Sequence, residues 1–190
     1  MHGGVILYAG KYGSTEQYAR WLSQGTAYRC FDLEQNPNPD LKPYRVVIVG
    51  SPIRQRQLLL GGWCREHRAE FLDKQVIDFS VSATPVSDPV LPEMIEESLG
   101  EALFKQCQWF PLPGRLIKAE LSLKDRLILY FHDYFGEKIS KRYMQRDFNH
   151  IAPGHLEPIF AYLWDWYHRD HRPLYQSGKL RMPKTGHLND

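Results

Sequence analysis

The chain has 190 residues, of which 43% are hydrophobic and 24% are charged, and its formal net charge is +2. This length suits one domain with a sizeable core, and the composition is ordinary for a globular protein. The small net charge gives no support for a nucleic-acid-binding protein, and no run approaches the roughly 20 apolar residues of a membrane span.

Three cysteines, Cys30, Cys64 and Cys107, lie far apart in the chain and form no CxxC pair. An odd number at this spacing argues against a disulfide framework or a zinc knuckle and favours a reducing compartment. The first residues also lack the basic start of a signal peptide. We therefore predict a cytoplasmic protein. The histidines at 168 and 171 lack the third ligand that a metal site needs, so we predict no metal site.

The first predicted strand, residues 5–9, is apolar throughout, as in strands covered on both faces. A glycine-rich loop joins it to a predicted helix at residues 15–24. Backbone N–H groups in such a loop, together with the helix dipole, can surround a phosphate. An ordinary turn with a Ser or Thr helix cap explains the same pattern. The candidate phosphate residues are Gly10, Lys11, Tyr12, Gly13, Ser14 and Thr15.

An edge strand at residues 28–33 and a buried strand at residues 46–49 come next, followed by a second loop and a predicted helix at residues 58–72. Arg54 and Arg56 in this loop could hold an anionic group. A solvated basic loop is the alternative. The candidate ligand-binding residues of the second loop are Ser51, Pro52, Ile53, Arg54 and Gln55.

A weaker apolar run predicts a strand at residues 76–81, and a third loop follows it. Small residues there would let the backbone approach a ligand, although Pro85 alone could set a simple turn. The candidate residues of the third loop are Ser82, Ala83, Thr84 and Pro85.

The rest of the chain predicts a helix at residues 91–104, a last strand at 108–112 and two helices at 123–143 and 156–168. Alternating strands and helices indicate a doubly wound α/β fold. Ligands of such folds bind beyond the carboxyl ends of the strands. We predict one domain over residues 1–172 and a C-terminal tail at 173–190.

The helix at residues 123–143 combines aromatic side chains with basic ones, among them Lys124 and Arg126. A basic amphipathic helix with aromatic anchors can lie on an anionic membrane. A helix packed on the sheet with a solvated basic face is the alternative.

Residues 5–19 resemble the opening of flavodoxins, whose phosphate loop has the pattern T/S-x-T-G-x-T. Gly13 and Thr15 match the last Gly and Thr, whereas Gly10 and Tyr12 stand where the pattern has hydroxyl residues. The resemblance implies a flavodoxin-like five-stranded parallel sheet of order 2-1-3-4-5, with helices on both faces. It also implies flavin mononucleotide (FMN), with its phosphate at residues 10–15 and its ring between the second and third loops.

Further segments are similar to the flavodoxin-domain branch that contains menaquinone-dependent protoporphyrinogen oxidase. They are residues 46–54, 79–82, 114–116, 123–127 and 147–148, in the same order. This resemblance implies an oxidoreductase of heme biosynthesis that passes electrons from a porphyrinogen to a quinone. It identifies no catalytic residue in this chain.

Three other functions fit the same residues. An electron-transfer flavodoxin is one, although such carriers are usually acidic. An FMN-dependent NAD(P)H:quinone reductase is another, and a flavin-free binding module that keeps the fold is the third.

Overall fold

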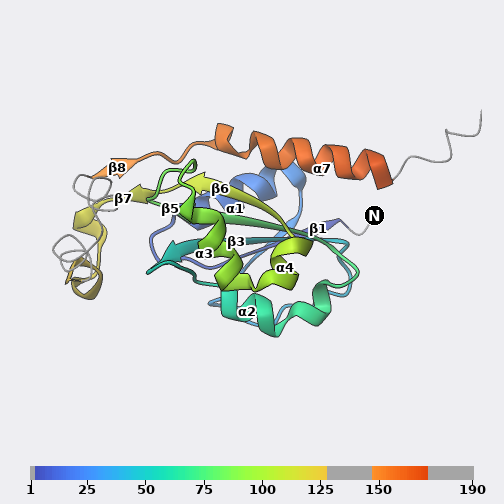
Figure 1. Cartoon of the computed structure of the whole chain (residues 1–190). Coiled ribbons are helices and arrows are strands. Elements are labelled where there is room, and N and C mark those ends of the chain that lie inside the picture. The colour runs from blue at the N-terminus through green and yellow to red at the C-terminus, as the bar shows by residue number, and fades with distance from the viewer. Residues whose placement is uncertain (1–2, 128–146, 171–190) are drawn as a thin grey trace, which may run out of the picture. The chain divides into compact units, whose positions relative to one another are not determined.

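The computed structural model describes residues 3–127 and 147–170 (Figure 1). The chain divides into two compact units, residues 1–156 and residues 157–190. The sequence instead predicted a boundary between a domain and a tail at residue 172, and this boundary stays a prediction.

The first unit is built on a parallel sheet with the strand order β2-β1-β3-β5-β6. Its strands are β1 (Gly4–Tyr8), β2 (Arg29–Asp32), β3 (Val46–Arg54), β5 (Gln75–Ser82) and β6 (Gln108–Pro113). A short strand, β4 (Gln57–Leu58), pairs antiparallel with the end of β3. Apart from this hairpin strand, the order along the sheet is the predicted one, and the flavodoxin-like α/β fold is confirmed.

Side chains alternate between the two faces along each strand. Helices cover both faces of the sheet (Figure 1). The helix α1 (Ser14–Thr26) packs on one face, where the Tyr18 ring meets Phe79 of β5 edge to face. Residues of α2 (Gly61–Glu66), α3 (Val90–Leu99) and α4 (Glu101–Gln106) share a core cluster with the other face of β1 and β3. Burial on both faces explains why these strands are continuously apolar in sequence.

The predicted helix at residues 58–72 is wrong in its extent. Leu58 pairs with Ile53 in the β3–β4 hairpin, and helix α2 begins only at Gly61. A 3₁₀ helix, Arg68–Phe71, follows it. A Cβ on Gly61 would lie 2.7 Å from the Ser98 carbonyl oxygen, so this glycine lets α2 approach α3 closely. The pairing of Leu58 in the hairpin and the close approach at Gly61 explain why the helix starts later than predicted.

The predicted helix at residues 91–104 is two helices. Gly100 has φ 81° and ψ 147°, which is not a helical conformation, and it ends α3 and begins α4. Glycine adopts this backbone region without the steric cost that a Cβ brings.

The segment after β6 holds β7 (Arg115–Leu116), a 3₁₀ helix at Lys118–Glu120 and β8 (Phe148–Asn149), which pairs antiparallel with β7. A further 3₁₀ helix, Pro153–Leu156, ends the first unit. The second unit contains α7 (Glu157–Asp170), where a helix was expected. The predicted helix at 123–143 lies mainly outside the described residues. None of the described helices has the length and apolar character needed to cross a membrane.

One acidic side chain is buried inside the sheet of the first unit. Asp78 of β5 is 2% exposed, and neither carboxylate oxygen has a hydrogen-bond partner among the described residues. The thiols of Cys64 on α2 and Cys107, just before β6, are close enough to interact with it electrostatically. Burial raises the pKa of Asp78 to about 8.

Candidate functional site

Strands β1, β3 and β5 run parallel, so the chain leaves all three at the same edge of the sheet. The three predicted loops belong to this edge. Lys11, Tyr12 and Arg54, from the first and second loops, meet at one carboxylate, as described below. This shared edge is the candidate functional site.

The first loop ends at Gly13, which precedes α1 with φ 77°. The Gln17 N–H donates to the Gly13 carbonyl oxygen at 2.9 Å, but no side chain caps the start of the helix. The first N–H groups of a helix have no acceptor within it. They point outward at the positive end of the helix dipole, where an anion is stabilised.

Thr15 adds a hydroxyl to this loop. The residue is only 2% exposed, and a Cβ on Gly10 would lie 3.2 Å from its Oγ1. In the described part of the chain its hydroxyl makes no hydrogen bond, and only the Asp78 carboxylate oxygens are both buried and unpaired there, so the Thr15 oxygen is accessible to a ligand. The uncapped helix start and this hydroxyl fit a phosphate group, which would accept from both.

The side chains of Lys11 and Tyr12 are directed to a segment far along the chain. The Lys11 ammonium donates to Ser122 Oγ at 3.0 Å and to Asp125 Oδ2 at 2.8 Å. The Tyr12 hydroxyl donates to Asp125 and accepts from the Ser122 N–H at 3.2 Å. Neither side chain therefore serves the helix start in this arrangement.

Asp125 also joins the first loop to the second. Arg54 Nη2 lies 3.4 Å from Asp125 Oδ2, and the Arg54 guanidinium lies 5.4 Å from the centre of the Tyr12 ring. Hydrogen bonds from Lys11 and Tyr12 hold the pKa of the Asp125 carboxyl well below its usual range. From the sequence, Asp125 stood out only as part of an Asp-Arg pair, without a role.

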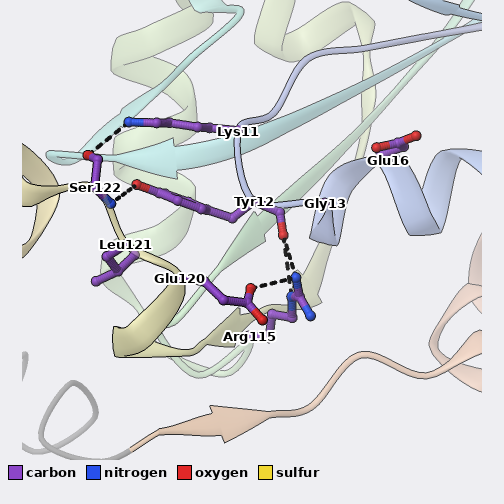
Figure 2. Close-up of a pocket in the computed structure, with 8 residues that line it drawn as sticks. All are labelled: Lys11, Tyr12, Gly13, Glu16, Arg115, Glu120, Leu121 and Ser122. Carbon is purple, nitrogen blue, oxygen red and sulfur yellow. Dashed lines mark hydrogen bonds and ion pairs between the residues drawn. The ribbon is translucent and has the colours of Figure 1, made fainter.

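Arg115 lies on the other side of Tyr12 (Figure 2). Its Nε and Nη2 donate to the Tyr12 carbonyl oxygen at 3.3 and 3.0 Å, and Nη2 also pairs with Glu120 at 2.8 Å. A pocket of about 580 Å³ opens here. Its lining residues are Lys11, Tyr12, Gly13, Glu16, Arg115, Glu120, Leu121 and Ser122.

The second predicted loop is mostly strand. Strand β3 continues to Arg54, and a two-residue turn of Gln55 and Arg56, with φ 49° and 65°, leads into β4. Positive φ at both positions is typical of a type I′ hairpin turn. Ser51 is fully buried and its Oγ accepts from the Leu60 N–H at 3.0 Å. Its hydroxyl holds the fold together, which leaves Pro52, Ile53, Arg54 and Gln55 as the half-buried or exposed part.

The third predicted loop begins where β5 ends at Ser82. The Ser82 hydroxyl donates to the Thr84 carbonyl oxygen at 3.0 Å, and the Ser82 carbonyl oxygen accepts from the Gly114 N–H at 2.7 Å. Ala83, Thr84 and Pro85 are partly exposed. The loop thus has a fixed start and an accessible end.

No group of metal-binding side chains occurs within residues 3–127 and 147–170.

The profile of the flavodoxin domain family matches residues 5–137. A flavodoxin, WrbA-like protein from Agrobacterium tumefaciens is 15% identical with a TM-score of 0.43, over 75% of this chain and 98% of that chain. A flavoprotein in complex with FMN from Lactobacillus acidophilus is 12% identical with a TM-score of 0.44, over 58% and 91%. An FMN-dependent NADH-azoreductase from Bacillus anthracis is 10% identical with a TM-score of 0.40, over 75% and 100%. No curated protein matches the sequence.

Proposed function

The chain belongs to the flavodoxin domain family, and on this premise we propose that it binds FMN at the carboxyl edge of its sheet and acts in electron or hydride transfer. The observation that carries the proposal is the start of α1. Gly13 leaves it without a side-chain cap, and the hydroxyl of the largely buried Thr15 lies beside it without a hydrogen-bond partner among the described residues.

The residues of the three loops have different roles in binding FMN. The N–H groups of residues 13–15 and the Thr15 hydroxyl bind the phosphate. Pro52 to Gln55 and Ala83 to Pro85 flank the ring and limit its contact with water. When bound, FMN supplies the redox chemistry, and the protein supplies binding, orientation and electrostatics.

An absorbance spectrum of the purified protein, before and after addition of FMN and dialysis, tests this function. We expect flavin bands that survive dialysis. A protein that stays colourless after reconstitution would contradict the proposal and favour a flavin-free binding module.

For the reaction itself we propose oxidation of a porphyrinogen with a quinone as the electron acceptor. The support is the resemblance of residues 46–54, 114–116 and 123–127 to the protoporphyrinogen oxidase branch. The test is turnover of the FMN-loaded protein with protoporphyrinogen and a quinone, beside a second assay with NADH or NADPH. Turnover only with the nicotinamide would instead indicate a quinone reductase.

A quinone is dissolved in lipid, and we propose peripheral membrane contact through residues 123–143. The support is the basic and aromatic composition of this segment. The protein should sediment with anionic vesicles and not with neutral ones, and Lys124→Glu should weaken this binding. Equal recovery with both kinds of vesicle would contradict the contact.

A further inference from the structure

The phosphate loop of this chain is short of side-chain donors. Gly10 has no side chain, and the Tyr12 hydroxyl and the Lys11 ammonium are both bonded to Asp125. Backbone N–H groups and Thr15 are left as donors from the loop itself. A charged hydrogen bond to a phosphate is stronger than a neutral one, and Arg is over-represented where proteins recognise phosphate.

Arg115 is the cation that faces the start of α1. If Gly13 carried a Cβ, that atom would lie 3.8 Å from Arg115 Nη2. The guanidinium is fixed in place by the Tyr12 carbonyl oxygen and by Glu120, and its side chain is 28% exposed. Its Nη1 makes no hydrogen bond to any described residue, so the guanidinium keeps unused N–H donors.

The charges around Arg115 and the start of α1 favour the binding of an anion between them. A guanidinium close to the positive end of a helix dipole is unfavourable, since cations are stabilised at the opposite end. Glu120 offsets part of this charge, and Glu16 in the first turn is paired with Arg20 at 2.6 Å. A phosphate between Arg115 and the first turn of α1 would interact favourably with both.

We propose that Arg115 binds the phosphate of FMN in this chain, as a replacement for the Ser or Thr hydroxyl donors that Gly10 and Tyr12 do not supply. Glu120 and the Tyr12 carbonyl oxygen are the positioning groups that orient its guanidinium. The inference rests on the proposed function, because it assigns a residue to the phosphate part of the same site.

The test compares FMN with riboflavin, which has the same ring and no phosphate. We expect Arg115→Gln to weaken FMN binding about tenfold to a hundredfold, as for the loss of a charged hydrogen bond. Its affinity for riboflavin should equal that of the wild type. The matched control is Arg68→Gln, which removes one exposed positive charge from the 3₁₀ helix before β5 and should leave both affinities unchanged.

The outcomes separate the two proposals. Wild-type protein that binds neither flavin overturns the proposed function and this inference with it. Wild-type protein that prefers FMN, with an Arg115→Gln variant that keeps this preference, overturns the inference alone.

If Arg115→Gln does not fold, Arg115→Lys replaces it in the same comparison. Lysine keeps the charge but lacks the planar guanidinium, which can donate to the Tyr12 carbonyl oxygen and to the phosphate at the same time. We expect the preference for FMN over riboflavin to fall about threefold to tenfold in this variant. An unchanged preference would overturn the inference.

Discussion

Thr15 is 2% exposed and its hydroxyl makes no hydrogen bond to a described residue, so the hydroxyl remains available as a donor to a ligand. Thr15→Val keeps the shape of the side chain and removes the hydroxyl. FMN affinity should fall by about 1–3 kcal/mol, as for a lost hydrogen bond to a charged group. Fluorescence titration with FMN measures this change.

The conservative variant Thr15→Ser restores the hydroxyl and should recover most of the affinity. The free energy of unfolding of Thr15→Val without flavin should be close to that of the wild type, because the hydroxyl makes no hydrogen bond within the described part of the chain. An FMN affinity that does not change would show that the phosphate lies elsewhere.

At the scale of elements, the contact between α2 and α3 depends on Gly61. A Cβ there would lie 2.7 Å from the Ser98 carbonyl oxygen and 3.0 Å from its Cβ, and a backbone atom cannot move aside cheaply. Gly61→Ala should therefore reduce the free energy of unfolding by about 1–3 kcal/mol. Urea denaturation measures the loss.

Gly62 provides a matched control in the same helix. A Cβ at this position would meet nothing within 4 Å. Gly62→Ala should stabilise the protein by up to about 1 kcal/mol, because alanine is the better helix former. Equal destabilisation by both substitutions would contradict the close approach of the two helices.

The observed element boundaries differ from the predicted ones where a tertiary contact overrides the local sequence pattern. The strand runs at residues 5–9 and 76–81 lie within one or two residues of β1 and β5, since both depend on apolar residues buried on both faces. The helix expected at 58–72 begins instead as a hairpin strand, because Leu58 finds a partner in Ile53. Apolar residues at helical spacing do not reveal such a partner.

For the whole molecule, the buried carboxyl of Asp78 makes stability depend on pH. Its pKa rises from 3.8 in a free side chain to about 8 in the fold. The folded protein therefore keeps a proton that the unfolded chain releases. The stabilising effect of this proton is complete below about pH 4 and is lost progressively as the pH rises to about 8.

Asp78→Asn removes this dependence while it keeps the size of the side chain. Relative to the variant, the wild type should lose stability between pH 5 and 8 by at most about 1.4 kcal/mol per pH unit. Urea denaturation at several pH values measures the difference. The control Asp73→Asn changes an exposed carboxyl just before the same strand.

Parallel stability profiles of the wild type and Asp78→Asn would contradict this account. They would mean that the carboxyl has the same proton affinity in the folded and unfolded chains. A gap that widens toward high pH and then becomes constant above about pH 8 is the expected form.

The resemblance to flavodoxins implied the order of the sheet. The sequence by itself determined the strand runs and the loop at residues 10–15. Both follow from short-range features, namely apolar runs covered on two faces and glycines before a helix. Because parallel strands end at one edge, the same features also predicted that three loops would share a site. The half-buried part of the second loop and the end of the third remain consistent with that prediction.

Only the tertiary structure decided which side chains surround the first loop. Arg115 is 103 residues from Tyr12 in the chain and Asp125 is 113 residues away, yet both bond to it. No local pattern encodes such contacts, because they depend on how the segment after β6 folds back over the loop. The tertiary structure also showed that Ser51 is buried and that its hydroxyl is occupied by Leu60, since burial depends on neighbours that are distant in sequence.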